Sequence, residues 1–515
     1  MHRALTIREF IEMVVDEDTR PFSLADPTLL ALALTCRTFQ EPALDMLWAS
    51  QYGLGHLVQC LPEDLWTYSD NSMDSVTLRE PTRATTQQDW QRFDVYARRV
   101  RRLHHEDDPH VHIRLKFFRE CHVSGPLFRW LLSSRPSHQL LPSLSFLGLG
   151  WTEDTSSKYY DSAHTLFGPR LTELDISTPR LANTNVLNVI LLHLPLRSPD
   201  VQSLRANESR YRESDCQPIP TGILPALKGL EKFGGSIFLT FDSLAGLSTL
   251  PNLTEATLLF DKQRAIGQLG TEGTAQTLTF RALERLTTRM TTMADAEALL
   301  SVCCFPRLQE ISLTTTFESN SGALDGVLRL IHDRCEHAIL ESIQIRSGAN
   351  EHLADVVHDI TAASFRRLYD FRHLRKFGLN TKMRIILDDD AVEEMAKSWP
   401  RLEYLHFRSP PTSATLEGLA HLARYCPSLS SLCIDVQTRG TVVSADVIPG
   451  GGFCNRALEE IEFCMSFPYG NEAKIAAFLN AIFPNIRRLD WVWRRVWDII
   501  LVLRMASEWE KHASK

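Results

Sequence analysis

The sequence predicts a repetitive α/β fold, a solenoid with parallel strands inside and helices outside, preceded by a small helical module. A short apolar pattern that opens with proline recurs along most of the 515 residues, and the copies at Pro400, Pro427 and Arg456 start 27 and 29 residues apart. A fixed period in the twenties is typical of a solenoid, in which each unit buries its apolar face against its neighbours. Apolar residues at helical spacing near the amino terminus predict the module.

Residues 1–55 are predicted to form three short helices. A second helix opens at Pro27 and runs through Leu34, and a third runs from about Thr38 through Trp48. The apolar positions of the first helix are Ile7, Phe10, Ile11, Val14 and Val15. Three helices in so few residues bury only a thin core, so we expect this module to need a partner or the adjoining array.

Residues 56–140 are predicted to be a connector, and Arg98-Arg-Val-Arg-Arg-Leu103 is a candidate irregular first repeat within it. The repeats follow over 141–495. Residues 496–515 are predicted to be a C-terminal cap helix and tail, because a terminal repeat must cover its exposed apolar flank. The nearby tryptophans could instead stack on a ligand, but the cap is the favoured interpretation of Trp491, Trp493, Trp497 and Trp509.

Each repeat begins with an eight-residue pattern. Proline or a substitute comes first, and the third, sixth and eighth residues are apolar. The other four positions accept any residue. The clear copies start at Pro142, Pro169, Pro306, Pro400, Pro427 and Pro484. The weaker copies, which bring the total to thirteen, start at Pro199, Lys228, Pro251, Arg281, Ala338, Arg372 and Arg456. The last three positions have the period of a strand. Helical spacing precedes the next proline over 294–303, 392–399, 416–425 and 475–483, and proline ends these helices.

This pattern resembles the leucine-rich repeat family. The usual asparagine three positions after the last apolar strand residue is absent from the clear copies, so the chain resembles a degenerate, helix-containing subtype. The resemblance implies a curved array that binds its partner on the strand side.

A second resemblance is carried by the amino-terminal module. Leu29-Leu-Ala-Leu-Ala-Leu-Thr-Cys-Arg-Thr-Phe39, followed by Glu41-Pro-Ala-Leu-Asp-Met-Leu-Trp48, resembles the second half of the F-box in the large family of mushroom-forming fungi. Leu61-Pro-Glu-Asp-Leu-Trp66 and Asp89-Trp-Gln-Arg-Phe-Asp-Val-Tyr-Ala97 are similar to the connector that those proteins carry before a leucine-rich repeat array. The chain departs from the family in lacking the Leu-Pro that opens the usual F-box, and 16–25 is a polar loop.

The F-box resemblance implies a substrate-recognition subunit of an SCF-type cullin-RING ubiquitin ligase. The F-box would dock a Skp-type adaptor, and through it a cullin, while the repeats would bind a protein substrate. By position, the implied adaptor contacts are Leu29, Leu30, Leu34, Cys36, Arg37, Phe39, Leu44 and Trp48. The alternative for each is the core of the module itself. Such an interface is expected to bury a few apolar side chains of a helix in a groove of the partner.

A substrate is expected to meet strand residues that point away from the core, because successive side chains of a strand face opposite sides. The candidates on this concave face are Arg346, Tyr404, His406, Arg408, Glu460, Glu462, Arg488 and Asp490. Mixed charge with an occasional aromatic residue suits protein recognition better than a small-molecule pocket. The alternative for each of them is an ordinary solvent-exposed residue with no role in binding.

Other motifs predict structure rather than chemistry. The segment His104–His112 has metal-capable side chains, but Pro109 and the clustered acids indicate a polar loop. Asp388 and the two acids after it are expected to cap a helix. Gly450-Gly-Gly452 lacks the lysine of a phosphate loop and is expected to be a turn. We therefore expect no cofactor, no metal and no catalytic set, because no Ser/His/Asp or Cys/His group stands out.

Composition limits the functions that remain. With 55 Lys+Arg against 63 Asp+Glu, the formal charge of −8 argues against a nucleic-acid binder that depends on phosphate neutralisation. We recognise no signal peptide and no apolar stretch of about 20 residues, which argues against a membrane role, and the 11 cysteines are expected to be reduced. The expected location is the cytoplasm or nucleus. The alternative function is a protein-binding scaffold outside the ubiquitin system with a helical N-terminal cap; a hydrolase is a distant third.

Overall fold

The computed structural model describes residues 27–72, 75–79, 81, 83–104, 120–134, 139–150, 157–178, 184–208, 222–235, 239–260, 277–317, 321–348, 359–408, 414–438, 448–464, 466–469 and 471–513. The chain divides into two compact units, 1–253 and 254–515, and each is described by itself. The predicted helix around Ile7–Val15 and the polar loop 16–25 lie outside the described residues.

Unit 1 opens with two helices that lead straight into a parallel sheet. Helix α2 (Pro27–Thr35) and helix α3 (Arg37–Ala49) match the second and third predicted helices, and strand β1 (Ser50–Tyr52) follows α3 without a break. The sheet continues through β4 (Arg102–His104), β6 (Phe146–Gly150), β7 (Glu173–Thr178), β8 (Ser203–Glu208) and β9 (Lys232–Gly235). Two strands of this sheet, β1 and β4, thus precede residue 141. Strand β4 begins four residues after Arg98, where the candidate irregular repeat predicts a strand.

The remaining elements of unit 1 lie between these strands. The helices are α4 (Gly55–Val58), η2 (Glu63–Leu65), η3 (Gln87–Trp90), α5 (Gln91–Ala97), α6 (Gly125–Ser134), η4 (Ser157–Leu166), α7 (Thr184–Arg197), η5 (Leu224–Ala226) and α8 (Phe241–Ser248). A separate small sheet contains β2 (Thr67–Ser72), β3 (Ser75–Arg79) and β5 (Glu120–Val123).

Unit 2 contains a second run of parallel strands. They are β10 (Glu255–Phe260), β12 (Arg285–Met290), β14 (Glu310–Thr315), β15 (Ser342–Ser347), β17 (Lys376–Asn380), β19 (Tyr404–Arg408), β20 (Ser431–Cys433), β21 (Glu460–Glu462) and β22 (Arg488–Leu489). Two short parallel pairs lie beside this sheet: β11 (Leu278–Thr279) with β13 (Cys303–Cys304), and β16 (Asp359–Thr361) with β18 (Arg384–Ile386).

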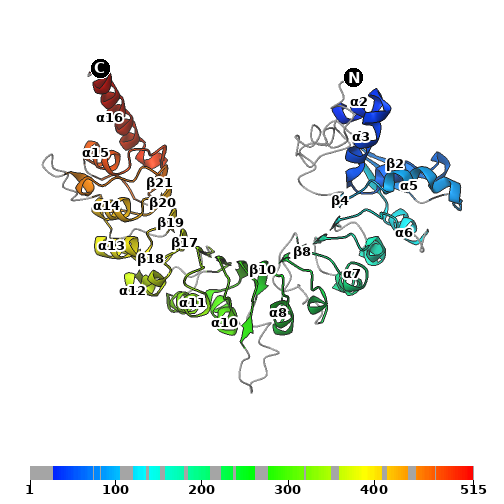
Figure 1. The fold of residues 1–515 in the computed structure, drawn as a ribbon, viewed down its shortest axis with the longest axis horizontal. Coiled ribbons are helices and arrows are strands. Elements are labelled where there is room, and N and C mark those ends of the chain that lie inside the picture. The colour runs from blue at the N-terminus through cyan, green and yellow to red at the C-terminus, as the bar shows by residue number, and fades with distance from the viewer. Residues whose placement is uncertain are drawn as a thin grey trace. The chain divides into compact units, whose positions relative to one another are not determined.

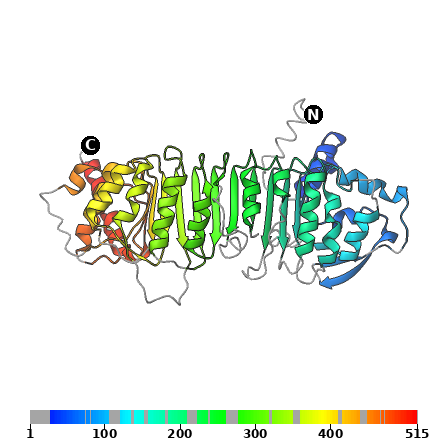
Figure 2. The same ribbon diagram turned by 90° about the horizontal axis from the view of Figure 1, so that it is seen from below.

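Helices alternate with the strands of unit 2. They are α10 (Met293–Val302), α11 (Ser321–Arg334), α12 (Ala362–Phe365), η7 (Arg366–Asp370), α13 (Asp389–Ser398), α14 (Leu416–Tyr425), η8 (Pro449–Gly452), α15 (Glu472–Ile482), η9 (Trp491–Trp493) and α16 (Arg494–Ala513). Within each unit the helices lie along one side of the strands (Figure 1), and the strands run side by side (Figure 2). None of the described helices is both long and apolar enough to cross a membrane.

The predicted repeat is confirmed at each of its thirteen copies. Every copy is followed, four residues after its first residue, by the start of a parallel strand, from Pro142 (β6) to Pro484 (β22). The weak copies at Lys228 and Arg281 obey the same rule, with β9 and β12. Each unit therefore has the α/β architecture of a leucine-rich repeat solenoid, as the sequence predicts.

Large apolar side chains fill the space between strands and helices. Trp399, at the end of α13, is fully buried; its indole Nε1 donates to the Leu368 carbonyl at 3.1 Å, and its ring centroid lies 5.1 Å from that of Phe377 on β17. Phe377 in turn lies 5.5 Å from Phe407 on β19. The repeats that start at Arg372 and Pro400 thus bury these aromatic residues against one another.

Two local predictions are also confirmed. The Asp388 carboxylate accepts a hydrogen bond from the Ala391 amide at 2.9 Å and caps α13. Gly450, Gly451 and Gly452 have φ of 64°, 62° and 84°, which glycine adopts without the strain that a side chain would bring. They form a turn, as expected.

Candidate functional site

The face of unit 2 that points away from the helices carries the predicted substrate contacts in rows. Tyr404 lies opposite Ser431, which lies opposite Glu460, which lies opposite Arg488, so one row crosses β19, β20, β21 and β22. A second row places His406 beside Cys433, and Cys433 beside Glu462. We call this the β19–β22 surface, made of Tyr404, His406, Arg408, Ser431, Cys433, Glu460, Glu462, Cys464 and Arg488.

Ion pairs join these rows. The Arg408 Nη2 lies 2.6 Å from the Glu462 Oε2 and so spans from β19 to β21 across β20. The Arg488 Nη1 lies 3.0 Å from the Glu460 Oε1. The Arg408 side chain is 57% exposed and that of Arg488 is 79% exposed, so each pair is worth little to stability. Both guanidinium groups therefore remain accessible to the carboxylates of a partner.

An aromatic pair lies at one edge of this surface. The rings of Tyr404 and His406 stack with centroids 3.6 Å apart, and the His406 Nε2 lies 2.9 Å from the Ser431 Oγ. Burial lowers the pKa of His406 to about 4, and it raises the pKa of Tyr404. Both side chains are therefore uncharged at neutral pH and offer a half-buried, mainly apolar contact beside the ion pairs.

The low pKa of His406 predicts a pH-dependent stability. The folded chain keeps this imidazole neutral down to about pH 4, whereas the unfolded chain binds a proton near pH 6.5, so stability is lost as the pH falls through this interval. His406→Gln should keep the contact with Ser431. It should reduce the loss of unfolding free energy on acidification by about 1 kcal/mol, which is less than the full pKa shift implies because solvent screens a half-buried group. Urea unfolding at pH 7.5 and 4.5 measures it. Equal losses in both proteins would contradict the assignment.

One contact on this surface, between Cys433 and Cys464, was missed by sequence reasoning. The Cys433 Sγ lies 2.7 Å from the Cys464 Sγ, and the Glu462 carboxylate lies within 4.8 Å of both sulfur atoms. The hydrogen bond between the thiols raises the pKa of Cys433 and lowers that of Cys464. Cys464 follows β21 with φ of 38°, so alternation along a strand could not have predicted where its side chain points.

The two remaining predicted substrate contacts lie at the margins. Arg346 on β15 is exposed. Burial raises the pKa of Tyr404, and the positive charge of Arg346 offsets part of that rise. Asp490 is half-buried directly after β22, and its backbone carbonyl accepts from the Trp493 amide at 2.9 Å. The structure therefore brings Tyr404, His406, Arg408 and Glu462 into one group and Glu460 and Arg488 into a neighbouring pair.

In unit 1, the structure divides the eight predicted adaptor contacts by exposure. Leu29 is buried with Ala33, Ala43 and Leu47 in a small core between α2 and α3. Leu30 and Leu34, by contrast, are 54% and 79% exposed, one helical turn apart on α2. Arg37 is exposed, and the four half-buried residues are Cys36, Phe39, Leu44 and Trp48. We call Leu30, Leu34, Cys36, Arg37 and Phe39 the α2–α3 surface.

Helix α3 is tied to the connector on its other side. The Trp48 ring stacks on the Tyr96 ring of α5 with centroids 4.4 Å apart. Arg99 forms ion pairs with two acids of α3, at 2.6 Å with Glu41 and also with Asp45. Trp48 and Leu44 thus belong largely to the internal packing, which is the alternative that the sequence left open for them.

The other sequence motifs show no ligand-like arrangement in the described residues. His104 stacks on Tyr52 and lies 4.8 Å from the Phe146 ring; the rest of the predicted polar loop, 105–112, lies outside the described residues. Trp493 is fully buried against Phe463, with ring centroids 4.0 Å apart, and its Nε1 donates to the Ser466 carbonyl. Trp493 thus packs beneath the last repeat, beside α16, whereas Trp491 and Trp509 are 84% and 69% exposed and do not cover its apolar flank.

The chain was compared with known families, curated proteins and solved structures. No protein-family model and no curated protein matches the chain. A solved leucine-rich repeat protein of Leptospira interrogans is similar at 10% identity, covering 78% of this chain and 80% of that one, with a TM-score of 0.38. The Rad7–Elc1 complex from yeast matches at 14% identity over 67% and 79%, with a TM-score of 0.32. An internalin from Listeria monocytogenes matches at 12% identity over 71% and 94%, with a TM-score of 0.31.

Proposed function

We propose that this chain is the substrate-recognition subunit of an SCF-type cullin-RING ubiquitin ligase, acting in the cytoplasm or nucleus. The α2–α3 surface docks a Skp-type adaptor and through it a cullin, and the β19–β22 surface binds a protein substrate. The chain supplies no catalytic residue. It raises the local concentration of the substrate beside the conjugating enzyme, which makes an encounter between two molecules effectively intramolecular.

The observation that carries the proposal is the exposure of Leu30 and Leu34. Both lie in the segment that resembles an F-box, which distinguishes them from the equally exposed Leu192 and Leu196 of α7. A helix that offers apolar anchors at i and i+4 fits a groove on a partner. Burial of such anchors supplies most of the affinity in interfaces of this kind.

The β19–β22 surface has the chemistry of a protein-recognition site. It combines a stacked aromatic pair, Tyr404 and His406, with the Arg408–Glu462 ion pair, and the Glu460–Arg488 pair lies beside them. Tyrosine and arginine are enriched in protein interfaces, and exposed ion pairs can exchange partners at little cost. A substrate segment with both acidic and basic side chains is therefore the expected occupant.

Co-expression of the full chain with a Skp-type adaptor tests the proposal. The expected result is a complex that survives affinity purification and size-exclusion chromatography at equal stoichiometry. Deleting residues 1–55 is unsuitable as a control because α3 runs directly into β1 of the sheet. If the folded full chain and the adaptor elute separately at micromolar concentration, the ligase role is wrong.

A second candidate, a protein-binding scaffold outside the ubiquitin system, is favoured by the attachment of α3. The Trp48–Tyr96 stack and the ion pairs of Arg99 make α3 a natural cap for the first strand of the sheet. In this case the β19–β22 surface would still bind a protein, but no adaptor would be recovered. Substrate binding without adaptor binding would therefore favour the scaffold.

A further inference from the structure

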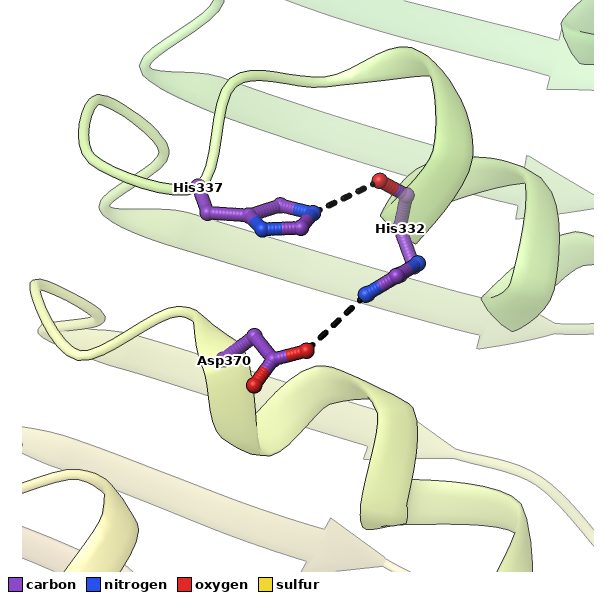
Figure 3. Close-up of side chains that lie close together, drawn as sticks. All are labelled: His332, His337 and Asp370. Carbon is purple, nitrogen blue, oxygen red and sulfur yellow. Dashed lines mark hydrogen bonds and ion pairs between the residues drawn. The ribbon is translucent and has the colours of Figure 1, made fainter.

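Three side chains gather where two successive repeats of unit 2 meet. His332 lies in the last turn of α11, His337 follows in the turn after that helix, and Asp370 ends η7. Figure 3 shows His332 between the other two, with one ring nitrogen directed at the Asp370 carboxylate. That Nε2 lies 3.0 Å from the Asp370 Oδ2, and one possible ligand atom of each residue lies within 4.8 Å of the others.

His332 is held between two carboxylates. Its Nδ1 lies 3.0 Å from the Asp333 Oδ1, while its Nε2 faces Asp370 at the same distance. A neutral imidazole has one N–H, so it can donate to only one of these acids, and its other nitrogen then presents a lone pair to a carboxylate oxygen. This arrangement is repulsive, at Asp370 or at Asp333 according to the tautomer, unless a positive charge is placed between that nitrogen and the carboxylate. Either a second proton or a metal ion can supply it.

We propose that His332, His337 and Asp370 bind a divalent metal ion of the zinc class. Two imidazoles and one carboxylate, with a fourth position for water, are a donor set that zinc accepts, at about 2.0–2.2 Å from each atom. Ligand atoms at these distances in a tetrahedral site lie about 3.3 Å apart, which is close to the existing separation of the His332 Nε2 and the Asp370 Oδ2.

Asp333 is placed to orient His332 as a metal ligand. In metal sites, the other ring nitrogen of a ligating histidine usually donates to a carboxylate, which orients the ring and makes the ligand more basic. Asp333 is in that position relative to His332, and in the tautomer whose Nδ1 donates to Asp333 the Nε2 directs its lone pair into the cluster.

The surroundings of the cluster also suit a metal. The His332 side chain is 23% exposed, and the fully buried Phe371 contacts both histidine rings at 6.3 Å and 4.9 Å between centroids. Phe371 limits ring motion from one side, while Asp370, at 65% exposure, leaves an entry path from solvent. His337 can join by giving up its hydrogen bond to the His332 carbonyl, now 2.9 Å long. The ion would link α11 of one repeat to η7 of the next.

Zinc titration of the metal-free full chain tests the proposal. We expect one Zn²⁺ per chain at micromolar concentration or tighter, measured by calorimetry, and a Co²⁺ complex with the visible absorption of a tetrahedral site. Asp370→Asn should abolish both, and this variant should fold because the side chain is mostly exposed. Asp333→Asn should keep the stoichiometry but weaken the affinity by about 10- to 100-fold.

Two control variants assign the binding. His373→Gln changes a nearby histidine that contacts Arg401 instead, and should leave the titration unchanged. Cys464→Ser removes one thiol of the Cys433–Cys464 pair, which lies outside the proposed site. This variant should therefore still bind one equivalent of zinc. The proposal is overturned if no zinc binds, which would leave His332 as an imidazolium between its two acids, or if binding is lost in Cys464→Ser but retained in Asp370→Asn.

Discussion

Replacing Leu30 and Leu34 together by aspartate is expected to abolish adaptor binding while the chain stays folded. Both leucines are largely exposed on α2, so their loss should change the free energy of unfolding by less than about 1 kcal/mol. At an interface each would be a buried anchor, worth about 2 kcal/mol or more, and aspartate would also bring an unpaired charge into the groove. The expected loss is at least about 100-fold in affinity, measured by calorimetry or biolayer interferometry with a purified Skp-type adaptor.

Helix α7 offers a matched control for this experiment. Leu192 and Leu196 are 55% and 79% exposed and also lie four residues apart in unit 1, so they reproduce the exposure and spacing of Leu30 and Leu34. Their double aspartate variant should bind the adaptor as the unmodified chain does. If both variants weaken binding equally, α2 is not the docking helix and the effect is one of general surface charge.

Replacing Asn455 by alanine is expected to destabilise unit 2 by about 3 kcal/mol. This side chain is 1% exposed and makes four hydrogen bonds to the backbone of two repeats. Its Nδ2 donates to the carbonyls of Cys426 at 2.7 Å and Leu429 at 3.2 Å. Its Oδ1 accepts from the amides of Ala457 at 2.6 Å and Leu458 at 3.0 Å. Alanine would remove the partners of the buried Leu429 carbonyl and Leu458 amide, which costs more than the bonds themselves contribute, while the Cys426 carbonyl keeps its bond from the Leu429 amide.

Asn485 is the natural comparison, because it lies thirty residues further on, near the start of the next repeat. Its Nδ2 donates only to the Arg456 carbonyl, at 2.8 Å, and the side chain is exposed. Asn485→Ala should therefore cost less than about 1 kcal/mol. Urea unfolding of the full chain, followed by tryptophan fluorescence, compares the two variants. If both variants lost the same free energy of unfolding, the buried hydrogen bonds of Asn455 would contribute no more to stability than the exposed one of Asn485.

The strands could be predicted because the repeat sets their phase. Apolar residues at alternate positions, here Leu405 and Phe407, fix which side chains face the helices, so Tyr404, His406 and Arg408 were correctly expected on the opposite face. The start of the sheet was harder to predict. Strand β1 has only three residues, Ser50–Tyr52, and no proline-led pattern, and its central residue is a buried glutamine rather than an apolar side chain.

Exposure within α2 could not be predicted for a similar reason. Residues 29–34 are apolar without interruption, so no periodicity indicates which leucines face the core. Tertiary packing separates buried Leu29 from exposed Leu30 and Leu34. The cluster of His332 and Asp370 was also beyond reach, because 38 residues separate them and the repeat lengths in this region vary.

Tandem affinity capture tests the central claim most directly, since a substrate-recognition subunit must hold its adaptor and its target at the same time. Complexes would be captured first through the tagged adaptor and then through this chain, and the proteins retained would be identified by mass spectrometry. We expect a target that is retained with the unmodified chain and lost with Arg408→Glu combined with Arg488→Glu, while the adaptor stays. The account would be contradicted if capture through this chain alone recovered the target but the tandem capture recovered the adaptor and this chain without it.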